Sequence, residues 1–178
     1  MSEMNIINPN NFNPKINELW GKQWFLLTSG SFSEKNYNTM TVAWGFFGIM
    51  WNKPVAAVVV RPTRHTFEFI EKYDTFTLTA FDMSNMDYFN ALKLLGTKSG
   101  RDSDKIAETC LTIAKSDLIE APTFKEAELS IECKKIYKDD FKPENFLIPE
   151  IENSYPEKDY HTIYFGEINQ IKGVDKFN

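Results

Sequence analysis

Two arginines and a threonine surround the predicted start of a helix that follows directly on a strand. Arg61 and Arg64 carry positive charge, and Thr66 adds a hydroxyl group. The N-terminus of a helix offers unpaired N–H groups and a partial positive charge, which favour a bound anion. Arginine also forms charge-assisted hydrogen bonds with phosphate oxygens. The pattern therefore indicates a phosphate-binding turn, and an ordinary turn with solvated arginines is the alternative.

The strand and the helix that would hold this turn are predicted from the side-chain pattern. Residues 55–60 are apolar on both faces, as in a central strand, and Pro62 stops the strand because it has no N–H to donate. Thr63 is the predicted N-cap of the helix, on which Phe67 and Ile70 share one face. The arginines are therefore expected between a buried strand and a helix start.

An earlier predicted strand, residues 39–44, has one bulky face and one small face. Its side chains alternate between bulky Met40, Val42 and Trp44 and small Thr39, Thr41 and Ala43. The small face would let a flat ring come close to the backbone. Beside a phosphate-binding turn, this strand predicts a ligand that is planar and phosphorylated.

A glycine-containing loop offers a second place for an anion. Gly100 allows close backbone approach, while Arg101 and Lys105 lie near the start of a short predicted helix, residues 102–108, capped by Asp102. A surface turn with solvated charges is the alternative. The run that precedes Ser99 is not a phosphate-binding P-loop, because its lysine is not preceded by glycine.

Length and composition exclude several classes of protein. The 178 residues favour one domain, and the net charge of −5 argues against nonspecific binding to nucleic acid or to an anionic membrane. Residues 1–14 do not form a signal peptide, and no apolar run approaches a membrane span. The two cysteines are expected to be packing residues of a cytoplasmic protein, and together with the two histidines they lack metal-ligand spacing.

Strands dominate the remainder of the chain, with helices inserted between them. Residues 1–20 are expected to form a loose arm with at most a short helix near 15–19. Strands are predicted over 24–28, 74–81, 127–133 and 161–172, with a bulge at 134–135, and helices over 84–95 and 102–108. This pattern favours a closed antiparallel barrel over a doubly wound sheet.

Five blocks in this order resemble the flavin reductase-like family. They are residues 38–45, 51–54, 60–66, 96–105 and 155–168, and the resemblance extends from about residue 24 to residue 171. It implies a single flavin reductase-like domain over 1–178. The implied fold is mainly β: an FMN-binding split β-barrel, antiparallel and of Greek-key type, with a few inserted helices. The resemblance also implies a homodimer with flavin at the subunit boundary, and the 15% aromatic content agrees with a ligand site or a buried interface.

The same resemblance, with the residues discussed above, defines the expected site. The residues expected to bind FMN are Asn38, Met40, Thr41, Ala43, Trp44, Arg61, Pro62, Thr63, Arg64, Thr66, Phe67, Ser99, Gly100, Arg101 and Lys105. Ala43 stands where the family commonly has serine, so one polar contact is missing. The histidine that matches His161 lies near the flavin ring, where it could orient a nicotinamide; a buried barrel-end histidine is the alternative. His65 is expected on a helix surface.

The expected function is an FMN-binding oxidoreductase. A reduced nicotinamide, NADH or NADPH, would deliver hydride to the flavin, and the electrons would pass to free flavin, a partner protein or a small acceptor. The alternative is a flavoredoxin-like electron carrier that holds FMN tightly and reacts poorly with nicotinamide. The sequence has no Gly-x-Gly-x-x-Gly dinucleotide fingerprint and no Gly-x-Ser-x-Gly nucleophile elbow. These absences count against Rossmann enzymes and hydrolases of that kind.

Overall fold

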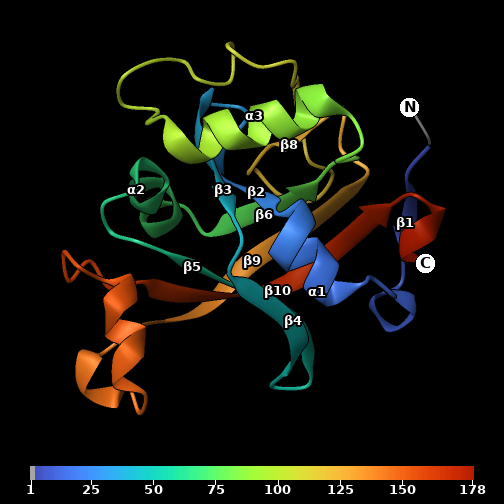
Figure 1. Ribbon diagram of the computed structural model, residues 1–178. Coiled ribbons are helices and arrows are strands. Elements are labelled where there is room, and N and C mark those ends of the chain that lie inside the picture. Colours follow the sequence, from blue (N-terminus) through green and yellow to red (C-terminus); the bar gives the residue numbers. More distant parts are fainter. Residues whose placement is uncertain (1–2) are drawn as a thin grey trace.

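One eight-stranded antiparallel sheet forms the body of the protein (Figure 1). The computed structural model describes residues 3–178. The strands lie in the order β3 (Asn36–Val42), β2 (Phe25–Ser31), β6 (Thr75–Ala80), β9 (Leu129–Asp140), β10 (Thr162–Gly173), β5 (Lys53–Val60) and β4 (Gly45–Met50), and β1 (Asn5–Ile7) pairs with β10. Each of these pairs is antiparallel, which confirms the expected mainly β architecture.

The sheet curls until its two ends meet, but it does not close. Its end strands, β3 and β4, are separated in the chain only by Ala43 and Trp44, and β3 also contacts β5. Within residues 3–178 no ladder of hydrogen bonds joins β3 to β4 or to β5. The barrel is therefore split along this line.

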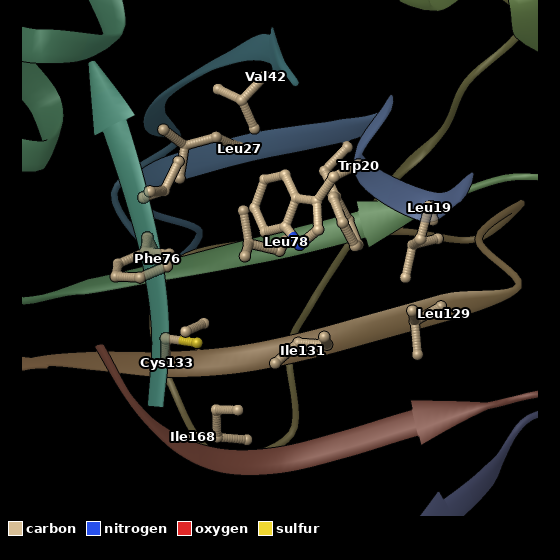
Figure 2. Packing of buried hydrophobic residues seen from close by; sticks show 14 of the residues in the cluster. Leu19, Trp20, Leu27, Val42, Phe76, Leu78, Leu129, Ile131, Cys133 and Ile168 are labelled. Atoms are coloured by element: carbon tan, nitrogen blue, oxygen red, sulfur yellow. The ribbon is translucent and has the colours of Figure 1, made fainter. Parts of the chain in front are cut away.

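The inner face of the sheet forms the main core (Figure 2). Leu27, Phe76, Leu78 and Ile131 project inward from neighbouring strands, and the indole of Trp20 lies among them. All of these side chains are buried. Burial of a large apolar side chain contributes roughly 1.5–3 kcal/mol. The side chains of this core therefore stabilise the folded sheet and fix the positions of the strands on either side of the split.

The N-terminal segment is packed, which corrects the expected loose arm over residues 1–20. Residues 1 and 2 lie outside the described part; the segment after them contains β1, η1 (Pro9–Asn11), α1 (Ile16–Glu18) and the π-helical turn η2 (Leu19–Gln23). Trp20 is buried against Phe25, with ring centroids 4.7 Å apart, and against Phe47 at 5.4 Å. The polar composition of the segment suggested that it would be loose, but a few large apolar residues are enough to pack it against the core.

Two helices, α2 (His65–Lys72) and α3 (Met86–Thr97), flank β3 (Figure 1). Their starts differ slightly from the prediction. Arg64, not Thr63, occupies the N-cap position of α2, and Asn85 caps α3 by accepting a hydrogen bond of 2.9 Å from the Asp87 N–H. α3 also continues past Gly96, the predicted stop. The predicted helix over 102–108 is a series of turns, in which the Asp104 carboxylate accepts from the Ala107 N–H at 3.2 Å.

The remaining elements are short. β7 (Ile113–Ala114) pairs with β8 (Thr123–Phe124), and η3 (Pro143–Asn145), η4 (Pro149–Ser154) and η5 (Asp175–Phe177) are single 3-10 segments. The predicted bulge is present one position later, because Ile136 has no partner where β9 pairs with β10. Cys133 is buried as expected, but Cys110 is exposed. None of the helices in residues 3–178 is long and apolar enough to cross a membrane.

A projecting hairpin joins β4 to β5, although no strand was predicted over residues 45–50 (Figure 1). Its two turn residues, Trp51 and Asn52, both have left-handed backbone conformations, with φ of 51° and 57°. These are the conformations of a type I′ turn, whose twist matches that of the flanking strands. An aromatic residue at such a position is uncommon, and it leaves the Trp51 side chain exposed at the tip.

Candidate functional site

A cleft follows the split in the barrel. One part of it, here called the strand pocket, has a volume of about 160 Å³ and is lined by Met40, Thr41, Val42, Ala43, Trp44, Val59, Arg61, Arg64 and His161. The other part, the loop pocket, has about 100 Å³ and is lined by Asn38, Met40, residues 63–66, residues 95–101 and Lys105. Met40 and Arg64 line both, so the two pockets adjoin.

β3 forms one wall of the cleft, and its small side chains do not all face the same space. Thr39 is buried and bonds to Thr28 at 2.9 Å, so it lies outside the strand pocket. Thr41 lines the pocket but donates its hydroxyl hydrogen to the Leu92 carbonyl of α3 at 2.5 Å. The strand pocket therefore has Met40, Ala43 and Trp44 in its wall, while the Thr41 hydroxyl is already engaged by α3.

The end of β5 delivers Arg61 to the strand pocket, where a carboxylate holds it. Its guanidinium donates to the Asp159 carboxylate at 2.8 Å and to the Ser154 carbonyl at 2.7 Å, and it lies 5.0 Å from the centre of the Tyr155 ring. Burial is the largest single effect on Asp159 and disfavours its ionised form, but the hydrogen bond and the charge of Arg61, with smaller contributions from other hydrogen bonds, together lower the pKa of Asp159. Arg61 therefore anchors the segment after β9 to the cleft.

Arg64 is the more available cation. Its guanidinium donates to the Gly96 carbonyl at 3.3 Å, and it has no carboxylate partner in the part of the chain that the structure describes. It occupies the N-cap position of α2 and lines both pockets. An uncompensated guanidinium beside the free N–H groups of a helix start is a favourable arrangement for a phosphate.

The loop after α3 packs directly on β3 and α2. The Asn38 side-chain amide donates to the Thr66 hydroxyl at 2.8 Å, and both residues are buried. A Cβ atom at Gly100 would lie 2.2 Å from the Asn38 side-chain oxygen and 3.3 Å from the ring of His65. A Cβ atom at this position would force Asn38 or the loop to move. Because residue 100 is glycine, the loop can pack close to β3 and α2 and form one wall of the loop pocket.

Three further cations line the loop pocket: Arg101, Lys105 and Lys98, of which Lys98 is paired with the Glu108 carboxylate. Arg101 donates to the Glu68 carboxylate at 2.5 Å and to the Thr63 carbonyl at 3.2 Å, which ties the loop to α2. Lys105 is buried and donates to the carbonyls of Leu95 and Lys98 at 2.9 and 3.0 Å. Burial, with a smaller contribution from the charge of Arg64, lowers the pKa of Lys105 to about 8. Its ammonium group thus faces the carbonyls at the C-terminal end of α3, where a cation is favoured.

His161, just before β10, closes the strand pocket. It is 8% exposed, its Nδ1 lies 2.8 Å from the Tyr155 hydroxyl, and its ring lies 5.2 Å from that of Trp44. Burial first, and then the charge of Arg61, lower the pKa of His161 to about 4. The imidazole is therefore neutral at pH 7, so it can offer one hydrogen bond to a ligand but no charge.

The structure brings together all the predicted site residues except Pro62 and Phe67. Pro62 is exposed at the turn, and Phe67 packs against the core, with its ring centroid 6.4 Å from that of Tyr164. His65 is the first residue of α2, in keeping with the expected helix position, and its half-buried side chain also lines the loop pocket. Tyr155 and Asp159 were missed, although both lie within six residues of His161.

A larger open depression lies on the other side of the loop. It has a volume of about 620 Å³ and shares Asn38, Gly100, Arg101 and Lys105 with the loop pocket. Its wall also contains the carboxylates of Asp102 and Asp104, which offset the positive charge. The smaller cleft, with Arg64 uncompensated, is therefore the better site for an anionic group. It suits a ligand with a flat ring in the strand pocket and an anionic group in the loop pocket.

Known proteins share this sequence pattern and this fold. The family model described as flavin reductase like domain matches residues 22–176. The fold is similar to that of flavoredoxin from Desulfovibrio vulgaris (TM-score 0.66, 22% identity, covering 92% of this chain and 75% of that one). It is also similar to an FMN-binding domain of a flavin reductase-like enzyme from Shewanella baltica (0.68, 16%, 97% and 78%). A third similar structure is the NADH:FAD oxidoreductase SgcE6 of Streptomyces globisporus (0.63, 14%, 88% and 78%).

Proposed function

Because the chain belongs to the flavin reductase-like family, we propose that it is an FMN-binding oxidoreductase that accepts hydride from NADH or NADPH and passes the electrons onward. The observation that carries this proposal is the position of Arg64. It lies without a carboxylate partner among residues 3–178, at the start of α2 and at the junction of the two pockets. A phosphate in the loop pocket and a flat ring in the strand pocket would use both parts of the cleft.

The residues present fit FMN. Arg64 and the first N–H groups of α2 would hold the phosphate, and Gly100 keeps the loop close enough to line the same pocket. The loop pocket, about 100 Å³, is compact, in keeping with a mononucleotide. Trp44 and His161 border the space for the ring. Bound FMN supplies the two-electron chemistry, and the protein's part is to hold the reacting rings in place.

His161 is the residue proposed to orient the nicotinamide. It is neutral, buried and at the border of the strand pocket, so it can direct one hydrogen bond without adding charge. Hydride transfer needs the reacting atoms about 3–3.5 Å apart, so a fixed hydrogen-bonding group affects its rate strongly. No side-chain acid or base is required for this step.

A flavoredoxin-like electron carrier is the second candidate, and the similarity to the flavoredoxin from Desulfovibrio vulgaris favours it. In that function the flavin would exchange electrons with a redox partner protein, and nicotinamide would react poorly.

If the protein is instead a reductase, its electron acceptor would be free flavin, a partner protein or a small molecule. Two cysteines without a disulfide agree with a reducing cytoplasm as its location.

We also propose that the protein is a homodimer. Phe46, Trp51, Tyr137 and Phe165 form a row across β4, β9, β10 and the hairpin turn, here called the aromatic strip, with ring centroids 5.7–6.2 Å apart. Trp51 at the tip is 57% exposed. A contiguous exposed apolar patch of this kind is typical of an interface. We propose that a second copy of this chain packs against the aromatic strip and shields it from water.

Cofactor analysis and anaerobic kinetics test the function. We expect the purified protein to be yellow and to release FMN, which chromatography of the extracted cofactor identifies. The FMN-loaded protein is then mixed without oxygen with NADH and, separately, with NADPH in a stopped-flow instrument. One of them should bleach the flavin within seconds, since turnover is typically on the order of 1–1000 per second. Bleaching by dithionite but by neither nicotinamide supports the carrier, and a colourless protein that binds no added FMN contradicts both.

A further inference from the structure

Tyr155 is the hydrogen-bond partner of His161, and the surrounding side chains hold the Tyr155 ring in place. Tyr155 follows η4 and is buried, with its hydroxyl 2.8 Å from His161 Nδ1. Its ring stacks on Phe146 with an interplanar angle of 11°, and the Arg61 guanidinium lies 5.0 Å from its centre. The stacking on Phe146 and the nearby guanidinium therefore hold the ring, and with it the hydroxyl, in place.

Hydrogen-bond accounting decides which of the two groups donates. In residues 3–178, His161 Nδ1 is the hydrogen-bond partner found for the Tyr155 hydroxyl. Burial raises the pKa of Tyr155, although Arg61 opposes this, so the hydroxyl keeps its proton. If Nδ1 carried a proton and donated it, the hydroxyl hydrogen of Tyr155 would be buried without an acceptor, which is costly. Tyr155 therefore donates, and Nδ1 accepts.

The other ring nitrogen then carries the proton of the neutral imidazole. His161 Nε2 has no partner among the described residues, and His161 lines the strand pocket. The charged groups that face the ring are Arg61 and Arg64 from the end of β5 and Asp159 from the segment before β10. The two arginines disfavour an additional positive charge, and Asp159 is already engaged by Arg61.

We propose that Tyr155 is a positioning residue that fixes His161 as the tautomer with its proton on Nε2, so that His161 donates a hydrogen bond to a carbonyl oxygen in the strand pocket. This rests on the proposed function, in which the acceptor is a carbonyl of the flavin ring or the carboxamide of the nicotinamide. Without Tyr155 the imidazole can exchange tautomers and rotate. It then loses its fixed direction toward the ligand.

The tautomer can be measured directly, because the chain has only two histidines. Long-range proton–nitrogen NMR spectra of the 15N-labelled protein distinguish a protonated ring nitrogen from an accepting one, and a His65→Gln variant assigns the signals. At pH 7 we expect His161 to be protonated at Nε2 only. In Tyr155→Phe the Nδ1 resonance should move toward the value of a nitrogen that accepts no hydrogen bond. Protonation at Nδ1 in the wild type, or an unchanged Nδ1 resonance in Tyr155→Phe, overturns the proposal.

The matched control is Tyr160→Phe. Tyr160 lies in the same segment, but its hydroxyl bonds to Glu152 at 2.8 Å and not to His161. Its replacement should leave the His161 signals unchanged. These spectra need no turnover and can be recorded without flavin, so they remain informative even if nicotinamide does not reduce the protein. A change in Tyr160→Phe as large as that in Tyr155→Phe contradicts a specific role of Tyr155.

Addition of ligands identifies the acceptor. The Nε2–H signal is followed first on adding FMN and then on adding a non-reactive analogue of the reduced nicotinamide. A shift at the first step assigns the bond to the flavin, a shift at the second assigns it to the nicotinamide, and no shift at either step overturns the donor role. If the nicotinamide is the acceptor, Tyr155→Phe should raise its KM about threefold to tenfold, the value of one hydrogen bond, with FMN affinity unchanged. In that case, equal losses of nicotinamide and FMN affinity would indicate a merely structural role.

Discussion

At the scale of single residues, Arg64 and Arg61 differ although the sequence presents them alike. Arg61 donates to Asp159 and to the Ser154 carbonyl, whereas among residues 3–178 the one acceptor found for Arg64 is the Gly96 carbonyl. A guanidinium already paired with a carboxylate gains less from a phosphate than one that is not. The interaction with a phosphate group is therefore expected to depend more on Arg64.

Replacement of Arg64 by alanine should weaken FMN far more than riboflavin. A charge-assisted hydrogen bond contributes roughly 1.5–3 kcal/mol, so FMN affinity should fall on the order of tenfold to a hundredfold. Riboflavin has no phosphate and should bind nearly as before. Quenching of flavin fluorescence measures both constants, with the exposed Lys125→Ala as the control for lost positive charge. Equal losses for the two flavins would assign Arg64 to the fold instead.

The depressed pKa of His161 predicts a loss of stability in mild acid. The folded value of about 4 lies below the ordinary 6.5, so between these two values the unfolded chain binds more protons than the folded one. Stability therefore falls as the pH is lowered through this window, by on the order of 3 kcal/mol. Urea unfolding from pH 7 to pH 4 measures it, and His161→Gln should lose less stability than the wild type. Parallel curves for the two proteins would show that His161 titrates normally.

At the scale of elements, the loop after α3 matters because Gly100, which has no side chain, packs directly on the Asn38 side chain of β3. Gly100 lies against Asn38, which holds Thr66 of α2. One contact thus sets the distance between β3, α2 and the loop. The width of the loop pocket depends on this contact, and so does its match to a phosphate group.

Gly100→Ala should therefore disturb both stability and ligand binding. The added Cβ would lie 2.2 Å from Asn38 Oδ1, so the loop must move or the bond from Asn38 to Thr66 must break. We expect a loss of roughly 1–3 kcal/mol in unfolding free energy and weaker FMN binding. Gly48→Ala on β4 is the matched control, because its Cβ would meet no atom within 4 Å. If both variants melt at the same temperature, the packing of the loop on Asn38 does not require glycine at position 100.

The segment between β9 and β10 is the second element that shapes the cleft. It supplies the Ser154 carbonyl and Asp159 to Arg61 and the Tyr155 hydroxyl to His161. Its outer side exposes aliphatic side chains, and Leu147 is 94% exposed. The segment therefore holds Arg61 and His161 in place through these hydrogen bonds, while its other side remains exposed to solvent.

At the scale of the whole molecule, the split barrel leaves the aromatic strip uncovered. The strip crosses strands on the outer face of the sheet, and the projecting hairpin extends it. An exposed aromatic patch on a sheet is a liability for a monomer, and association of two copies would remove it from water.

Charge placed on the aromatic strip should separate the proposed dimer. Trp51→Lys combined with Tyr137→Lys puts cations on two exposed positions, so the fold should persist while the interface is lost. Light scattering at micromolar concentration should then show a dimer for the wild type and a monomer for the variant. The control Leu147→Lys changes a fully solvated aliphatic residue outside the strip. A wild-type monomer that binds flavin would contradict the dimer.

The sequence by itself determined most of the long strands, but not β4, as well as the two main helices and most residues of the cleft. Strand periodicity places β2, β5, β6 and β10 to within a few residues, because alternation and apolar runs are local properties of the chain. The turn after β5 was recognisable from Arg61, Pro62 and Arg64. The ordered blocks of the family resemblance added the loop at Gly100 and His161, and the structure brings these to one cleft.

Only the tertiary structure decided how these residues are paired. Thr77 and Thr79 alternate with apolar residues along β6, a pattern typical of a half-buried strand, but both are buried and donate to the carbonyls of Pro122 and Leu26. In the same way, the partner of Arg61 lies 98 residues away, at Asp159. The partner of His161 is Tyr155, only six residues earlier, but the pair forms because the chain between them folds back on itself. Such pairings depend on how segments meet in space. Composition and periodicity carry no information about them, so a paired arginine and an available one look the same in the sequence.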